Sequence, residues 1–152
     1  MGLKIIIGGG SVAHLTLANM LERFDGMGYT LLEAYPSIAP QVGGRLLYSS
    51  GPVTISERLE EETGYQCVWL DRQMLLQTLY DNLKHKDNVL PNKRVLGVEA
   101  TESGVTVRTK EGSTYTGDTL VGADGVHSIV REEMWRVGGI SRPDIFRQEE
   151  DT

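Results

Sequence analysis

The sequence has little cysteine and no long apolar run, and both shortages limit what the protein can be. The one cysteine among 152 residues, Cys67, has no partner for an internal disulfide, which is typical of a reducing compartment. Its neighbours Gln66 and Val68 favour a half-buried strand thiol over a nucleophile. The apolar run of residues 3–7 is too short for a signal peptide, and no window approaches the roughly 18 apolar residues of a membrane span. We therefore expect a soluble, intracellular protein, with its location otherwise unknown.

Basic residues and histidines are also scarce, which argues against two further classes of binding. The 15 Lys and Arg residues are outnumbered by 21 Asp and Glu residues, and they form no cluster that would follow a nucleic-acid backbone. We therefore expect no nucleic acid as a partner. The histidines, His14, His85 and His127, have neither the spacing nor the neighbouring cysteines of a metal site, and we expect no metal. A chain of this length is expected to form one domain with its own core.

Glycine, in contrast, is abundant, and its densest cluster lies near the N-terminal end. The apolar run of residues 3–7 leads into Gly8, Gly9 and Gly10, and residues 11–23 then continue with helical spacing. The pattern predicts a strand, a glycine turn and a helix. Such a turn points free N–H groups and the positive end of the helix dipole at one place, where a pyrophosphate can bind.

Two registers of the glycine motif are open. The pattern GxGxxA fits residues 8–13, and Ala13 would then allow close packing of the helix on the strand. Counting from Gly9 instead places Ser11 at the second glycine position and His14 at the third, where a histidine is bulky. In this second register His14 either points outward from the first helical turn or weakens cofactor binding.

The next predicted strand, residues 29–33, ends in the carboxylate of Glu33 and completes a βαβ unit. Glu33 follows Gly9 by 24 residues, close to the roughly 20-residue separation of the acid that binds an adenosine ribose. A carboxylate there repels a 2′-phosphate, so we expect FAD or NAD rather than NADP. The alternative is that Glu33 is only a solvated strand end.

Two arginines are candidates for contacts with the cofactor. Arg45 ends a loop, residues 34–45, that contains two prolines and two glycines, and it could reach a phosphate or a flavin carbonyl or remain solvated. Arg72 opens a helix predicted over residues 72–84, with Asp71 as its N-cap. A cation in the first turn opposes the helix dipole, so a cofactor phosphate would suit Arg72 as a partner.

The second half of the chain predicts a small antiparallel meander followed by another strand, turn and helix. Extended segments between residues 93 and 117 are separated by glycine turns. Residues 119–122 then run into a tight turn in which Asp124 could accept hydrogen bonds from ribityl or ribose hydroxyls, while Gly125 allows close approach. A short helix is expected from about His127. We interpret His127 as a surface residue of its first turn and not as a general base.

Three stretches together resemble FAD-dependent monooxygenases of the aromatic-hydroxylase type. Among these, the chain is most similar to fungal epoxidases and hydroxylases that act on indole diterpenes and meroterpenoids. The stretches are residues 9–33, 70–77 and 122–128, and the resemblance extends to about residue 135. It implies an α/β fold, a Rossmann-like FAD-binding domain with a parallel sheet, flanking helices and a small antiparallel β-meander.

The resemblance also implies roles for the motif residues. Gly9 and Gly10 would border the FAD pyrophosphate, and Glu33 would hold the adenosine ribose. Arg72 would approach the phosphates, and Asp124 with Gly125 would lie beside FAD in a motif that the family also links to nicotinamide cofactors. The candidate cofactor-binding residues are Gly8, Gly9, Gly10, Ser11, Val12, Ala13, Glu33, Arg45, Arg72, Asp124 and Gly125. We assign no catalytic residue.

Two departures from the family pattern set the expected domain organisation. The segment around residues 45–63, which lines the flavin and the substrate in the family, is shorter here, and the substrate domain with its second Gly-Asp motif is absent. We therefore expect an FAD-binding domain over residues 1–137, followed by a polar tail over residues 138–152.

The leading hypothesis is a truncated homologue of FAD-dependent monooxygenases, which use NAD(P)H and O2 to epoxidise or hydroxylate a secondary metabolite. The alternative is a non-catalytic nucleotide-binding remnant or interaction module. A third hypothesis is that a second polypeptide supplies the substrate domain, in which case a small hydrophobic substrate could bind. The uncovered apolar surface would then be a docking face or lead to self-association.

Overall fold

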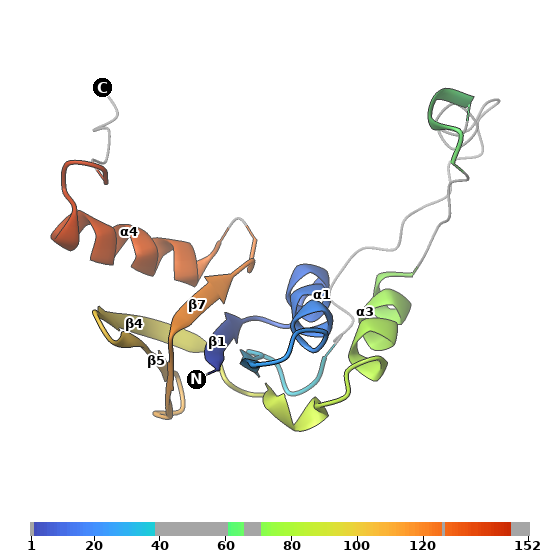
Figure 1. Ribbon diagram of the computed structural model, residues 1–152, viewed down its shortest axis with the longest axis horizontal. Helices are drawn as coiled ribbons and strands as arrows, with labels where there is room; N and C mark the ends of the chain where they lie inside the picture. Colours follow the sequence, from blue (N-terminus) through green and yellow to red (C-terminus); the bar gives the residue numbers. More distant parts are fainter. Residues whose placement is uncertain (1, 39–60, 66–70, 126, 147–152) are drawn as a thin grey trace.

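The computed structural model describes residues 2–38, 61–65, 71–125 and 127–146, and a parallel sheet lies at its centre (Figure 1). The four strands follow the order β3-β2-β1-β7, and every neighbouring pair is parallel. Their bounds are β1 (Leu3–Gly8), β2 (Met27–Leu32), β3 (Val89–Leu90) and β7 (Thr119–Gly122). The N-terminal strand is therefore flanked by β2 and β7, and the predicted α/β class is confirmed.

Two helices cover one face of this sheet, α1 (Val12–Leu21) and α3 (Arg72–Asp81), which lie side by side in Figure 1. Side chains alternate along a strand, and Ile5 and Ile7 of β1 belong to the core beneath the helices. The same core contains Leu15 of α1 and Leu76 of α3. Helix α3 ends earlier than predicted, at Asp81, but the buried side chain of Leu83 still packs into this core.

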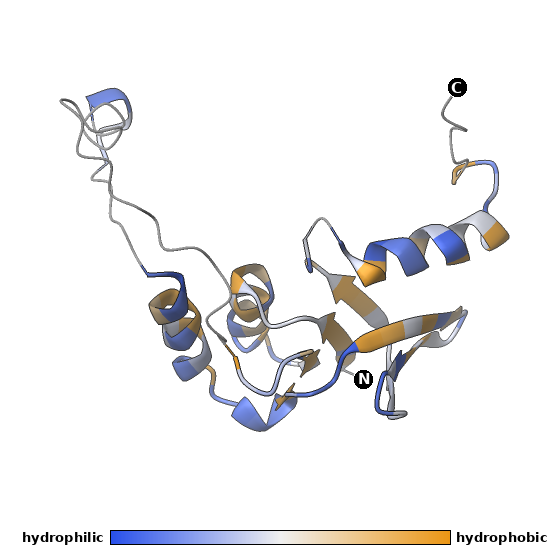
Figure 2. Cartoon of the chain, turned by 180° about the vertical axis from the view of Figure 1, so that it is seen from behind, coloured by the Kyte–Doolittle hydropathy of each residue, from blue (hydrophilic) through white to orange (hydrophobic). Residues whose placement is uncertain are grey.

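The other face carries the predicted antiparallel meander, whose strands follow the order β4-β5-β6. These strands are β4 (Val95–Thr101), β5 (Gly104–Thr109) and β6 (Thr114–Gly117). Ile6, which alternates with Ile5 and Ile7, packs here with Leu32, Val98 and Val107. Figure 2 shows hydrophobic residues concentrated in the strands, as expected for a sheet that is covered on both faces.

Polar side chains join the helices α1 and α3. Asn19 Nδ2 donates hydrogen bonds of 2.8 Å to the carbonyl oxygens of Leu15 and Leu79. Glu22, which follows α1, accepts hydrogen bonds of 2.8 and 2.9 Å from the N–H groups of Lys84 and His85. A short 3-10 helix, η1 (Lys86–Asn88), then leads into β3.

The last helix, α4 (Ile129–Ser141), begins where the sequence predicted but is not short. Residue 138, expected to start a polar and aperiodic tail, instead lies inside the helix, and Gly138 is buried. The absence of a side chain there leaves room for the ring of Phe146, which packs edge to face on Trp135 with centroids 5.3 Å apart. The sequence did not predict this packing, because two consecutive glycines, at 138 and 139, are typical of a helix end.

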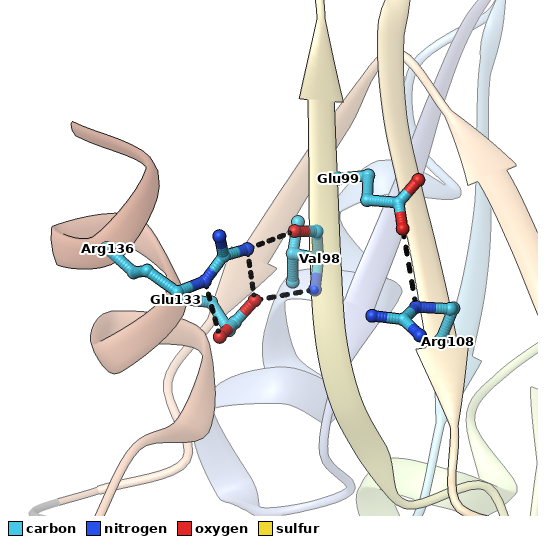
Figure 3. Close-up of polar contacts among 5 residues, drawn as sticks. All are labelled: Val98, Glu99, Arg108, Glu133 and Arg136. Carbon is cyan, nitrogen blue, oxygen red and sulfur yellow. Dashed lines mark hydrogen bonds and ion pairs between the residues drawn. The ribbon is translucent and has the colours of Figure 1, made fainter. Parts of the chain in front are cut away.

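Helix α4 lies against β4 through a side-chain pair that bonds to one residue of the strand (Figure 3). Glu133 Oε2 accepts a hydrogen bond of 2.8 Å from the N–H of Val98, and Arg136 Nη2 donates one of 2.8 Å to the carbonyl of Val98. Arg136 also pairs with Glu133 at 2.8 Å. This pair holds the helix on the meander.

Arg45 and the predicted strand thiol Cys67 lie outside the described residues. In the parts of the chain that the structure describes, no helix combines the length and apolar character needed to cross a membrane.

Candidate functional site

A cavity of about 450 Å³ lies at the carboxyl ends of β1, β2 and β7. Ligands of open α/β sheets bind at this end of the strands. The cavity is lined by most of the predicted cofactor-binding residues: Gly8, Gly9, Gly10, Ser11, Glu33, Arg72 and Asp124. Val12, Ala13 and Gly125 are not among its lining residues, and Arg45 is outside the described segments.

The turn between β1 and α1 has the predicted open structure. Gly9 has a φ of +125°, a conformation that side chains other than glycine rarely adopt, and its N–H donates to the Leu32 carbonyl at 2.9 Å. A side chain at Gly10 would overlap Glu33 Oε2. The first N–H groups of α1, at Val12 and Ala13, have no partner within the helix, so the turn leaves donors for a ligand.

Glu33 follows β2 and lies at the cavity wall, with only 7% of its surface exposed. Its Oε1 accepts a hydrogen bond of 2.8 Å from the N–H of Tyr35. The main chain of Glu33 bonds to Leu90 and Lys93 on the neighbouring segment at 2.9 and 2.7 Å. The side chain is thus held in place, while Oε2 lies against Gly10, with no hydrogen bond to it from the described residues. The solvated-strand-end alternative for Glu33 is therefore wrong.

Arg72 lies in the first turn of α3 and lines the cavity. The predicted N-cap is confirmed, because Asp71 Oδ1 accepts hydrogen bonds of 2.8 and 3.2 Å from the N–H groups of Gln73 and Met74. The capping carboxylate fixes the start of α3, the turn from which Arg72 lines the cavity.

Two more cations line the cavity, Lys93 and Arg94, and sequence reasoning missed them. Both follow β3, whose carboxyl end lies beside that of β2. Their position just after a short apolar strand was the sequence signal that could have placed them at the cavity. The guanidinium of Arg94 lies 5.8 Å from the ring centre of Tyr35. Lys93 Nζ pairs with Glu111 at 2.8 Å, so Arg94 is the less neutralised of the two.

Asp124 lines the cavity and also organises the start of α4. Its Oδ1 accepts a very short hydrogen bond from Ser128 Oγ, and its Oδ2 accepts one of 3.0 Å from the N–H of Ile129. Gly125 has a φ of +85°, which allows the tight turn that the sequence predicted. His127 is exposed and lines the cavity, in agreement with its interpretation as a surface residue.

The structure corrects both expectations about the third position of the glycine motif. Ala13 is exposed, so it does not provide the helix–strand contact of the GxGxxA register. His14 does not point outward: it is 1% exposed, and its ring lies over Gly9, which has no side chain to clash with it. The register that starts at Gly9 is therefore the structural one, with His14 in place of the third glycine.

His14 is held at both ring nitrogens. Nε2 accepts a hydrogen bond of 2.8 Å from the N–H of Ala123, and Nδ1 lies 2.8 Å from Ser11 Oγ. Burial lowers the pKa of the imidazole below its ordinary value, and the nearby Asp124 carboxylate opposes this shift only in part. The described segments contain no group of three or more His, Cys, Asp or Glu residues that could hold a metal ion.

Comparisons with known proteins identify relatives of this chain. No model of a known protein family matches the chain. The FAD-dependent monooxygenase prhF of Penicillium brasilianum is 36% identical over 97% of this chain and 38% of its own length. The FAD-dependent monooxygenase pyr5 of Aspergillus fumigatus is 38% identical over 97% of this chain and 39% of its own length. The chain thus spans about two fifths of the length of each of these two relatives.

Solved structures give the same result for the fold. HpxO of Klebsiella pneumoniae, complexed with FAD and uric acid, matches with a TM-score of 0.66 and 26% identity, over 85% of this chain and 41% of HpxO. The tetracycline destructase Tet(51) matches at 22% identity with a TM-score of 0.65, over 88% of this chain and 42% of that chain, and shows the shared fold. With an N-terminal glycine turn, an acid after β2 and an Asp-Gly turn after β7, the chain is a homologue of the FAD-dependent monooxygenases.

Proposed function

We propose that the cavity at the carboxyl ends of β1, β2 and β7 binds FAD. The observation that carries this proposal is the position of Glu33: its buried carboxylate lies against Gly10, directly beside the turn that opens α1. A ribose acceptor and a phosphate-binding turn are thus adjacent, as a dinucleotide requires. The complex of HpxO with FAD and the names of the fungal relatives support this choice of ligand.

The residues of the turn fit a pyrophosphate. The N–H groups that open α1 and the positive end of the helix dipole favour an anion at this point. Arg72 and Arg94 line the same cavity and would compensate the remaining phosphate charge. A side chain at Gly10 would overlap Glu33 Oε2 and Ile38 Cδ1, so the missing Cβ allows the Glu33 carboxylate to lie directly against the turn.

Glu33 would select the nucleotide at its ribose. Oε1 is already bonded to the Tyr35 N–H, which fixes the carboxylate, and Oε2 would accept from the ribose hydroxyls. The fixed negative charge would repel a 2′-phosphate. Asp124 and the open Gly125 turn would lie further along the cofactor, where Asp124 retains lone pairs for a hydroxyl donor.

For the protein as a whole we propose the activity of an FAD-dependent monooxygenase. The flavin would supply the redox chemistry, taking electrons from NAD(P)H and delivering one oxygen atom of O2 to a small hydrophobic substrate as an epoxide or hydroxyl group. The residues of this chain would bind and orient the cofactor. Substrate binding would depend on a substrate domain, from the same or a second polypeptide.

The alignment with prhF supports a shortening of this chain within the matched region, and we propose that it lies around residues 45–63. It spans 182 positions, more than the 152 residues of this chain, so the relative has additional residues inside the matched region. In our proposal the FAD-binding domain extends over residues 1–137, and the missing residues belong to the part that lines the flavin ring and the substrate.

A second candidate function is nucleotide binding without turnover. It is favoured by Asp124, whose two carboxylate oxygens are both bonded within the start of α4 and so already have a structural role. Mixing the FAD-loaded protein with NADH or NADPH separates the two candidates. NAD(P)H consumption with formation of hydrogen peroxide supports the redox function, whereas stable binding of FAD without consumption supports the second candidate.

The visible absorption spectrum tests cofactor binding directly. Purified protein incubated with FAD and desalted should retain flavin absorption, and Glu33→Ala should weaken FAD affinity by about tenfold, the effect of one lost hydrogen bond to a charged group. Glu102→Ala, which removes an exposed carboxylate from the turn between β4 and β5, is the matched control. A folded wild type that stays colourless at saturating FAD contradicts the proposal.

A further inference from the structure

The imidazole of His14 connects the two turns that line the cofactor cavity. Ser11 belongs to the turn after β1, and Ala123 belongs to the turn after β7. The two strands are direct neighbours in the parallel sheet, with Gly8 paired to Gly122. The ring bonds to Ser11 on one side and to the Ala123 N–H on the other, so one side chain sets the spacing of both turns.

The hydrogen bonds determine the protonation state of this ring. The main-chain N–H of Ala123 can only donate, so Nε2 must accept and carries no proton. A neutral imidazole then has its proton on Nδ1, which donates to Ser11 Oγ at 2.8 Å. The Ser11 N–H also points at Nδ1, but at 3.4 Å it is too far away to compete with the hydroxyl oxygen for that nitrogen. A second proton would place an N–H on Nε2, facing the N–H of Ala123. The bond between ring and turn would be lost.

Charged groups around the cavity act on this ring from several elements. Asp124, in the turn after β7, attracts a proton to the imidazole. The other titratable or cationic side chains that line the cavity are Glu33 and Tyr35 after β2, Arg72 at the start of α3, Lys93 and Arg94 before β4, and His127 before α4.

We propose that His14 is a positioning residue for the dinucleotide: its neutral ring holds the Ser11 and Ala123 turns at the spacing that binds FAD, and its protonation weakens FAD binding. The inference rests on the proposed function. It assigns a role to His14, which stands in place of the third glycine of the motif. The size of its side chain alone would predict only weaker binding of FAD. The space over Gly9 accommodates the ring, and both polar atoms of the ring are used.

The first test measures the pKa of the His14 imidazole by NMR of its ring nitrogens, with and without saturating FAD. Binding and protonation are linked, so FAD should lower the pKa of His14 by about one unit or more. One pH unit below the pKa measured for the free protein, the dissociation constant of FAD should be about five- to tenfold larger than at neutral pH. An unchanged His14 pKa on adding FAD would overturn the proposal, because a purely structural histidine gives that result.

The second test is a variant that keeps the acceptor but does not titrate. His14→Gln can offer an amide oxygen to the Ala123 N–H, so it should bind FAD within about threefold of wild type at neutral pH and lack the added loss at acid pH. His14→Gly restores the third glycine but removes the connection, and it should bind FAD about tenfold more weakly than wild type. His85→Gln, at an exposed histidine outside the cavity, should keep the wild-type pH profile.

The outcomes separate this inference from the proposed function. A wild type that binds FAD with the same pH profile as His14→Gln overturns the positioning role and leaves FAD binding intact. Tighter binding by His14→Gly also overturns it, because the ring would then be an obstacle. A folded wild type that binds no FAD at neutral pH overturns the proposed function and the inference together.

Discussion

Two helices of this protein each bond to the main-chain N–H of a distant strand or turn, and they do so in opposite settings. On α1, the neutral ring of His14 accepts from Ala123 inside the protein. On α4, the charged carboxylate of Glu133 accepts from Val98 beside solvent, with Arg136 as its partner (Figure 3). The same main-chain contact thus has a neutral acceptor where burial is complete and a charged pair where water remains close.

The burial of the two sites accounts for this choice. His14 is 1% exposed, and an imidazolium there would lose its hydration without a matched partner. The side chains of Glu133 and Arg136 are 17% and 51% exposed, so their charges keep part of their hydration. The first contact should therefore contribute to stability mainly through packing, and the second mainly through charge-assisted hydrogen bonds.

The largest effect is expected for the buried contact. His14→Ala leaves a cavity beside Gly9 and removes the acceptor of the Ala123 N–H, so it should lower the free energy of unfolding by about 3 kcal/mol. Urea denaturation measures this loss. Thr16→Ala, on the exposed side of the same helix, is the control and should change stability by less than about 0.5 kcal/mol. Equal effects of the two variants would contradict the packed role of His14.

Acid should weaken the two contacts in different pH ranges. The pKa of His14 is lowered by burial, so between its ordinary value of 6.5 and its folded value the unfolded chain binds a proton that the folded chain does not. Stability is therefore complete above pH 6.5 and falls on acidification below it, by about 1.4 kcal/mol per pH unit until the folded ring also titrates.

Glu133 behaves differently, because hydrogen bonds from Arg136 and Val98 hold its pKa below the ordinary value of 4.5, against the opposing effect of burial. Its contribution is present above pH 4.5 and is lost only below it. Denaturation curves from pH 8 to about 2 on wild type, His14→Gln and Glu133→Gln should thus separate two acid transitions. A wild type whose stability is constant between pH 6.5 and 5 would contradict the assignment to His14.

A smaller effect is expected for the contact on α4. Glu133→Ala removes the acceptor of the Val98 N–H and the partner of Arg136, and it should cost about 1 kcal/mol, because water can replace part of the lost bonding. The loss should be reduced in high salt, since screening already weakens the ion pair in wild type. Thermal denaturation at low and high salt measures both. A salt-independent loss would mean that the carboxylate acts through packing and its hydrogen bond to Val98, and not through the ion pair with Arg136.

The smallest effect is expected for the neighbouring pair on the meander. Glu99 and Arg108 lie 3.5 Å apart with side chains 65% and 62% exposed, and Figure 3 shows them beside the Glu133 network. Exposed pairs of this kind contribute little. Glu99→Ala should therefore leave the denaturation curve unchanged, whereas a loss as large as that of Glu133→Ala would show that exposure is not what separates the contacts.

Sequence reasoning predicted the parts of the fold that depend on local pattern. The glycine turn followed by a helix, the acid at the end of β2 and the N-cap at Asp71 each follow from residues close in sequence, and all three are present. The Asp124–Gly125 turn was found for the same reason, because Asp and Gly adopt tight turns through their own backbone preferences.

The errors concern contacts between distant segments. The burial of His14 depends on Ala123, more than a hundred residues away, and helical periodicity around residue 14 contains no information about that N–H. The length of α4 depends on Phe146 packing over Gly138, which makes a glycine favourable inside a helix. Lys93 and Arg94 were missed because β3 contains only two residues, and the sheet had to be known before its end could be located.

The pair on α4 has a consequence for association between molecules. β4 is an outer strand of the meander, and an outer strand with free N–H and carbonyl groups can pair with a strand of a second chain. At Val98, Glu133 and Arg136 already occupy the donor and the acceptor that such a strand would use. Helix α4 thus lies where a fourth strand would pair. The middle of β4 therefore cannot pair with a strand of a second molecule and extend the sheet.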